Sequence, residues 1–221
     1  MQDTYREIAG VRILGGRGTL KDEAIAVVRR ALMAGDMKPG LIYSANSLAP
    51  QLGVSNSPVR EAMMELASKG LLEVVKNRGF RVVEMTDKDR QEIYDLRMLV
   101  EVPSVLQVAR KGLTEEQIVE VERLADDTLA QARPDNMLAY LDADQSFHMA
   151  IIGILDNQRL TAIVENLRDQ SRVRGSYQLA ERGVLRESAE EHLPIVRALV
   201  AGDIELLEKL LIDHLDYARP H

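Results

Sequence analysis

Apolar residues near the start of the chain recur at helical spacing. The stripe within residues 20–34 predicts a first helix. A second helix should follow and end at Gly53, because glycine is a common helix terminator. Pro50 lies inside this second segment and has no N–H to donate, so we expect the helix to start late, near Asn46 or Ser47, or to kink.

A third helix and a hairpin are predicted next. Ser57 suits the N-cap and Pro58 the first helical position, and Gly70 should end the helix. Residues 72–75 and 80–83 then predict two strands joined by a short basic turn. The apolar stripe of the third helix, which should face a core, consists of Val59, Ala62, Met63 and Leu66.

From residue 87 onward the pattern is helical almost throughout. The expected helices cover residues 87–111, a segment starting at 114, and residues 136–155, 158–185, 187–201 and 203–217. The fold class is therefore mainly α, with a winged helix-turn-helix carrying a small β-hairpin, followed by an antiparallel bundle of about six helices. We place the domain boundary between residues 85 and 86, which gives domains 1–85 and 86–221.

The polar side of the third helix carries the candidate DNA contacts. Asn56, Ser57 and Arg60 lie near its start, where a recognition helix meets base edges and phosphates. The turn between the strands adds Lys76 and Arg78, with Gly79 beside them. A small helical domain whose stripe is merely core would show the same periodicity. The order helix, turn, helix and basic hairpin favours a DNA-binding module.

Charge is distributed unevenly along the chain. The overall net charge is −7, but residues 1–85 contain 12 Lys and Arg against 9 Asp and Glu, and residues 86–221 contain 16 against 26. A basic first domain joined to an acidic second domain would restrict nucleic-acid binding to the first domain. A chance fluctuation explains these totals equally well, so the inference of DNA binding depends on the motif.

Composition excludes several other classes. Cysteine is absent, which removes disulfides, thiolate metal sites and cysteine nucleophiles. Aromatic residues make up 4% of the chain, a value that favours helix-on-helix packing. No apolar run approaches the roughly 20 residues that span a bilayer. The first residues lack the apolar core of a signal peptide, so we expect a cytoplasmic protein with no membrane partner.

The segment GVSNSPVREAMMELASKGLLEVVKNRGFRV resembles the DNA-binding signature of the GntR superfamily of bacterial transcription regulators. The resemblance runs from about Leu20 to Val83. It implies that Arg60 contacts the operator and that Gly79 lets the wing tip approach the DNA backbone closely. The chain departs from the family pattern at Asn56, where the family usually has arginine, and the operator should differ accordingly.

Three histidines of the second domain are candidates for one site. Asp144 and His148 are four residues apart and share a helix face. His192 and His214 lie at opposite ends of an antiparallel hairpin that turns at Gly202, so they should be adjacent. One carboxylate and three imidazoles suit a divalent metal such as Zn, Ni or Mn, with Zn favoured. Alternatively, each histidine is an ordinary buried side chain with a hydrogen-bond partner.

The segments DADQSFHMAI and EEHLPIVRALVAGDIELLEKLLIDHL are similar to the FCD ligand-sensing domain of the FadR subfamily. The resemblance places the family's metal ligands on Asp144, His148, His192 and His214. It also implies that the metal helps to hold a small organic acid, with Arg97 near this effector. The sequence is equally compatible with a different role for Arg97, a surface ion pair with Glu101.

The helical pattern does not distinguish which of the residues Asn166, Arg168, Arg172 and Arg174 reach the same cavity. From these four we select Arg172 as a second effector contact.

We therefore expect a homodimeric transcription regulator without enzymatic activity, which acts as a repressor by binding a pseudo-palindromic operator in double-stranded DNA. A small carboxylate effector bound at the metal would modulate operator affinity. Three alternatives stay open at this point: a sensor of the metal itself, a purely structural metal, and a metal-dependent hydrolase.

Overall fold

The chain forms two compact units that meet at the Met85–Thr86 peptide. The computed structural model describes residues 19–181, 183 and 185–216, so the outer ends of the two predicted domains, 1–18 and 217–221, lie outside the described residues. Each unit is described by itself. Among the described residues, no helix combines the length and the apolar character needed to cross a membrane.

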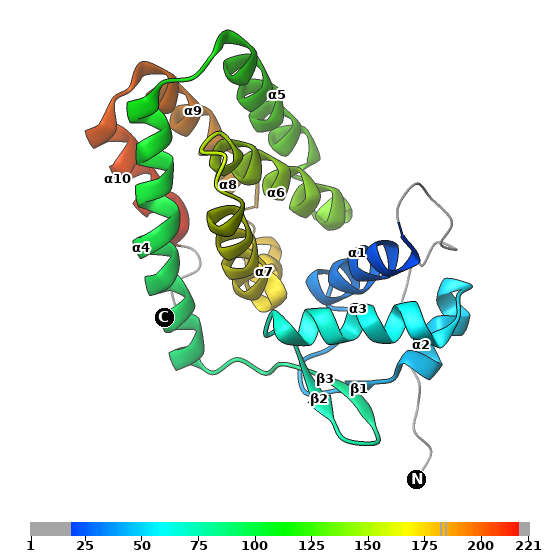
Figure 1. The fold of residues 1–221 in the computed structure, drawn as a ribbon. Coiled ribbons are helices and arrows are strands. Elements are labelled where there is room, and N and C mark those ends of the chain that lie inside the picture. The colour runs from blue at the N-terminus through cyan, green and yellow to red at the C-terminus, as the bar shows by residue number, and fades with distance from the viewer. Residues whose placement is uncertain (1–18, 182, 184, 217–221) are drawn as a thin grey trace. The chain divides into compact units, whose positions relative to one another are not determined.

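The first unit is a three-helix core with a small sheet (Figure 1). Helix α3 packs against α1, α2 and strand β2. The sheet order is β1-β3-β2, and both pairings are antiparallel. The elements are α1 (Leu20–Met33), β1 (Ile42–Tyr43), α2 (Ala45–Leu52), α3 (Asn56–Ser68), β2 (Leu72–Val75) and β3 (Gly79–Val82). This is the predicted winged helix-turn-helix, with the two-residue strand β1 added.

Two helix starts in this unit differ from the prediction. Helix α2 begins earlier than expected, because the Ser44 side chain accepts a hydrogen bond from the Ser47 N–H and caps the helix. Helix α3 has Ser55, not Ser57, at its N-cap position. Pro58 therefore lies in the third helical position, where it costs little because the first-turn N–H groups have no acceptor within the helix.

The second unit is an all-helical bundle (Figure 1). Helix α4 packs against α6, α7, α9 and α10, and α5 packs against α6, α8 and α9. The helices are α4 (Asp87–Lys111), α5 (Glu115–Gln131), the 3-10 helix η1 (Pro134–Asn136), α6 (Met137–Gly153), α7 (Gln158–Glu181), α8 (Leu185–Glu190), α9 (His192–Ala201) and α10 (Ile204–Leu215).

Among the described residues, the bundle contains seven α-helices, where we predicted about six. Residues 158–185 were expected to form a single helix, but α7 ends at Glu181 and Gly183 adopts a left-handed φ of 71° before α8. Residues 187–201 were expected to form a single helix. The structure has two helices there, α8 and α9, with Glu191 between them in a helical backbone conformation. The last helix was predicted to extend to Tyr217, which lies outside the described residues.

Helix α4 buries only part of its apolar residues. Ile93, Val105 and Val108 are in the core, as expected for an inward stripe. Leu96 and Leu99 were also available for burial, but their side chains are 46% and 73% exposed. Their exposure leaves an apolar strip on the outer face of α4.

Candidate functional site

A buried cluster of one carboxylate and three imidazoles lies within the helical bundle. Asp144 and His148 come from α6, His192 is the first residue of α9, and His214 lies near the end of α10. One ligand atom from each residue lies within 4.8 Å of the others, and all four residues are buried. The structure therefore brings all four predicted metal residues together.

Local geometry explains why these residues meet. Asp144 and His148 are one turn apart on the same face of α6. Gly202 adopts the left-handed conformation, with φ of 67°, and ends α9 so that α10 folds back against it. Because His192 and His214 lie at comparable distances from this turn, their rings come together with centroids 4.7 Å apart.

The spacing of the donor atoms fits a divalent metal. The three Nε2 atoms are 3.2–3.3 Å from one another, and Asp144 Oδ1 is 3.3 Å from His192 Nε2. Ligands placed tetrahedrally at about 2.0–2.1 Å from Zn²⁺ are separated by about 3.3–3.4 Å. Nitrogen and oxygen donors at this spacing are suited to Zn²⁺ and to the other divalent metals that imidazole binds.

The three imidazoles are neutral, as metal ligands must be. Burial lowers the pKa of His192 to about 3, and the Arg168 guanidinium adds to the shift. Burial also lowers the pKa of His148 and of His214 well below the ordinary histidine value. Each ring therefore keeps a nitrogen lone pair at neutral pH.

Residues around the cluster orient the rings. His214 Nδ1 donates to Glu191 Oε2 at 2.7 Å, which leaves its Nε2 as the lone-pair nitrogen. His148 Nδ1 faces Glu101 Oε1 at 3.6 Å. The Phe147 ring contacts the His192 ring, with centroids 4.5 Å apart. Carboxylates behind metal-binding histidines are typical of metal centres.

A layer of guanidinium groups lies directly behind Asp144. Arg168 donates through Nη2 to Asp144 Oδ2 at 2.8 Å and through Nη1 to Glu101 Oε1 at 2.5 Å. Arg172 pairs with the same Asp144 oxygen, and its Nη1 donates to Gln145 Oε1 at 2.6 Å. Asp144 therefore presents Oδ1 to the histidines while the guanidiniums hold Oδ2.

Both predicted effector residues belong to this layer. Arg97 donates through Nε to Glu101 Oε2 at 2.8 Å and through Nη1 to Ser171 Oγ at 3.3 Å. The Arg97–Glu101 pair that the sequence left open is thus present, but both side chains are buried and the pair is not at the surface. Arg172 is buried as well.

The sequence prediction did not include Gln145, did not select Arg168, and considered Glu101 only as a surface partner of Arg97. Arg168 and Arg172 are four residues apart in α7, so a signal was available in two basic residues on one face of a helix. Burial alone would raise the pKa of Glu101, but the neighbouring Arg97 and Arg168 hold it well below the usual range. Glu101 is therefore ionised and balances two guanidiniums.

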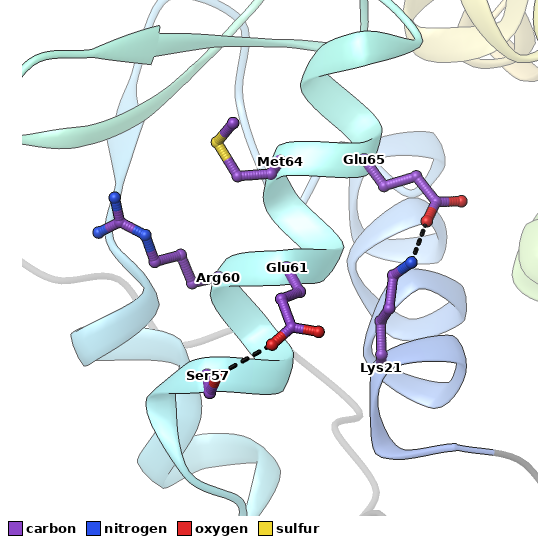
Figure 2. A pocket seen from close by; sticks show the side chains of 6 residues that line it. All are labelled: Lys21, Ser57, Arg60, Glu61, Met64 and Glu65. Carbon is purple, nitrogen blue, oxygen red and sulfur yellow. Dashed lines mark hydrogen bonds and ion pairs between the residues drawn. The ribbon is translucent and has the colours of Figure 1, made fainter.

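The exposed face of α3 bears the candidate DNA contacts. Ser57, Arg60, Glu61 and Met64 line a surface hollow of about 390 Å³ together with the Lys21–Glu65 ion pair (Figure 2). Ser57 donates to Glu61 Oε1 at 2.9 Å, which holds this carboxylate away from Arg60. Arg60 is exposed and has no ion-pair partner among the described residues, so its charge is available to DNA.

The wing turn is also exposed at its basic residues. Lys76 and Arg78 project from the turn between β2 and β3. Gly79 has a structural reason to be glycine: its φ is 124°, and an added Cβ would lie 2.3 Å from the Tyr43 carbonyl oxygen. Close packing against β1 thus accounts for Gly79, and its contact with DNA stays a prediction.

Replacing Gly79 with alanine should destabilise the first unit by about 2 kcal/mol or more, since a left-handed backbone and a backbone collision both oppose the side chain. Thermal unfolding of the full chain would measure the loss. Gly202→Ala is the matched control: its φ is also positive, but the added Cβ would meet nothing within 4 Å. An equal loss in both variants would show that the collision with Tyr43 is unimportant.

The fold and sites together define a DNA-binding transcription regulator built from two domains. Residues 20–82 match the bacterial regulatory proteins of the gntR family, and residues 92–217 match the FCD domain. The chain therefore belongs to the gntR family and carries an FCD domain, an architecture like that of FadR.

The chain is similar to several transcription regulators. McbR of Escherichia coli K12 is 27% identical over 86% of this chain and 89% of its own, and its structure superposes with a TM-score of 0.79 over 90% of this chain and 94% of that one. The gluconate operon transcriptional repressor of Bacillus licheniformis is 25% identical over 86% of this chain and 79% of its own. YdhC of Bacillus subtilis is 30% identical, and that match covers 64% of this chain and 63% of YdhC.

Proposed function

We propose that this protein is a cytoplasmic transcription repressor whose affinity for a double-stranded, pseudo-palindromic operator is regulated by a small carboxylate. Helix α3 enters the major groove with Asn56, Ser57 and Arg60, and the wing residues 76–79 reach the neighbouring phosphates. The uncompensated charge of Arg60 on the exposed face of α3 supports this assignment. Two relatives are named as repressors, which supports repression rather than activation.

Arg60→Ala should weaken operator binding about 10-fold or more, because one good base contact contributes roughly 1–3 kcal/mol. Fluorescence anisotropy would measure the affinity for a DNA fragment selected by the wild-type protein, at one fixed salt concentration. Arg186→Ala removes the same charge from an exposed position in α8 and should leave the affinity unchanged. If the two variants bind alike, Arg60 does not contact the operator.

The metal and the effector occupy the second unit in this proposal. A divalent ion, with Zn²⁺ favoured, is held by Asp144, His148, His192 and His214. The observation that carries the proposal is that Asp144 joins this donor set directly to a buried guanidinium layer. When bound, the metal would supply an electrophilic position for a carboxylate. Arg97 and Arg172 would supply the compensating positive charge.

The same guanidinium layer could transmit effector binding to the DNA-binding unit through α4. Arg97 and Glu101 both lie on α4, which begins two residues after the unit boundary. Its start is fixed by a capping box in which Thr86 and Asp89 exchange hydrogen bonds, so displacements of α4 reach Thr86. An effector acts on operator affinity only if it binds the DNA-competent and incompetent states unequally.

A thermal-shift screen of small carboxylic acids tests this function. The protein would be measured with bound Zn²⁺ and after EDTA treatment, and active acids would then be added to the operator complex. Stabilisation that requires metal, with release of the operator, is the expected result. Operator affinity that follows the metal concentration alone would favour a metal sensor. Substrate turnover in a protein indifferent to DNA would favour a hydrolase.

We propose that the protein is a homodimer, because the two halves of a pseudo-palindromic operator are bound by two DNA-binding units. The exposed apolar strip of α4 at Leu96 and Leu99 supports an interface there, since such surfaces are typically covered. Sedimentation equilibrium should give twice the chain mass of 24.7 kDa at micromolar concentration. A monomer mass both with and without operator DNA would contradict the dimer.

A further inference from the structure

Gln145 is a buried amide that uses only half of its hydrogen-bonding capacity. It follows Asp144 in α6 and its side chain is more than nine-tenths buried. Its Oε1 accepts from Arg172 Nη1 at 2.6 Å and from Arg168 Nε at 3.3 Å. Its Nε2 has no hydrogen-bond partner among the described residues. A buried amide donor without an acceptor is destabilising, which points to an acceptor supplied from outside the chain.

The orientation of this amide is fixed by its neighbours. Guanidinium groups only donate hydrogen bonds, so the oxygen of Gln145 must face Arg168 and Arg172. Rotating the amide by half a turn would place its NH₂ group against two donors. The two Nε2–H bonds therefore stay directed away from the guanidiniums and are free to bind an oxygen of a ligand.

The charge around Gln145 indicates what kind of oxygen this is. The contacts join three guanidiniums, of Arg97, Arg168 and Arg172, to two carboxylates, of Glu101 and Asp144. Guanidinium groups and a divalent metal on Asp144 all stabilise negative charge, so an anionic oxygen beside Gln145 is favoured over a neutral one. A carboxylate supplies such an oxygen.

We propose that Gln145 is a specificity residue that donates a hydrogen bond to the second carboxylate of a dicarboxylic acid effector. This inference rests on the proposed function, in which the first carboxylate is held at the metal. Gln145 thereby distinguishes a dicarboxylate from a monocarboxylate of the same length. The metal residues alone do not make this distinction, because they meet the carboxylate that the two acids share.

Matched acid pairs test the assignment on the full-length protein. The probes are malonate and propionate, succinate and butyrate, and glutarate and pentanoate, titrated calorimetrically into protein loaded with Zn²⁺ and freed of excess metal. We expect at least one of the three dicarboxylates to have an affinity about 10-fold or more above that of the monocarboxylate of the same length. A charge-assisted hydrogen bond can supply a difference of this size. Metal content measured before and after titration shows that the acid has not extracted the ion.

Two variants separate a donor role from a structural one. Gln145→Glu keeps an oxygen for the guanidiniums but replaces the donor, and Gln145→Leu removes both without adding charge. Both should abolish the preference for the dicarboxylate. The readout is the ratio of dicarboxylate to monocarboxylate affinity within each variant, because Gln145→Leu also removes the acceptor of Arg172 Nη1. Gln107→Leu, on the exposed face of α4, is the control and should keep the preference.

Equal binding of the paired acids by the wild type, or a preference that survives in both variants, would overturn the inference while leaving the carboxylate effector in place. Tighter binding of 2-hydroxybutyrate than of succinate would also overturn it, because a hydroxyl would then be the group recognised. If no acid of either class binds the metal-loaded protein, the proposed function fails and this inference fails with it.

Discussion

His192→Ala should reduce metal affinity at least about 100-fold, because it removes one of four ligands from a buried site and leaves no nearby replacement among the described residues. In the wild type, metal at 100 times its Kd should add about 2.7 kcal/mol to the free energy of unfolding. The variant should show almost none of this gain at the same concentration.

The metal-dependent gain is the quantity to compare, since the alanine also leaves a cavity that lowers stability without metal. Zn²⁺, Ni²⁺ and Mn²⁺ titrations monitored by thermal unfolding would measure it. Glu191→Gln, which weakens only the hydrogen bond to His214 Nδ1, should lose about 10-fold to 100-fold in affinity. Glu190→Ala is the control, because Glu190 is the exposed last residue of α8 and precedes Glu191 directly. Wild-type metal affinity in His192→Ala would refute the ligand set.

Each half of the metal cluster was predictable from spacing, and the family resemblance joined the two halves into one ligand set. Asp144 and His148 share a helix face at any helix length, and the turn at Gly202 fixes which ends of α9 and α10 meet. Neither argument requires knowledge of side-chain rotamers. The same holds for the winged helix-turn-helix, where glycines and caps mark the element ends.

The guanidinium layer was not predictable to the same extent. Arg168 and Arg172 occupy one face of α7, but their contacts with Asp144 depend on how α6 and α7 pack and on the extended rotamers of two long side chains. Glu101 appeared in the sequence only as a helical neighbour of Arg97. Its second partner, Arg168, is 67 residues away and meets it only through packing of α4 on α7.

Small errors at element ends have local causes. The third helix was expected to begin with Ser57 as its cap, but two serines precede Pro58 within three positions, and the pattern does not distinguish them. Strand β1 has two residues, too few for an alternating pattern, and is defined only by pairing Ile42 and Tyr43 with β3. Tertiary contacts decide both cases.

Glu101→Leu should lower the free energy of unfolding of the second unit by about 3–5 kcal/mol, because it leaves Arg97 and Arg168 buried without their shared carboxylate. That is a large share of the roughly 5–15 kcal/mol by which a domain is stable. Urea denaturation would measure the loss, and hydrogen exchange in α4 and α7 would assign it to this unit.

A double-mutant cycle shows whether the loss comes from the unpaired charge. Adding Arg97→Met to Glu101→Leu removes one of the two guanidiniums that lost this carboxylate, so the double variant should recover part of the stability. Glu120→Leu breaks an exposed pair with Arg123 and should leave the urea midpoint nearly unchanged. A Glu101→Leu loss no larger than that of this control would mean that solvent compensates the guanidiniums.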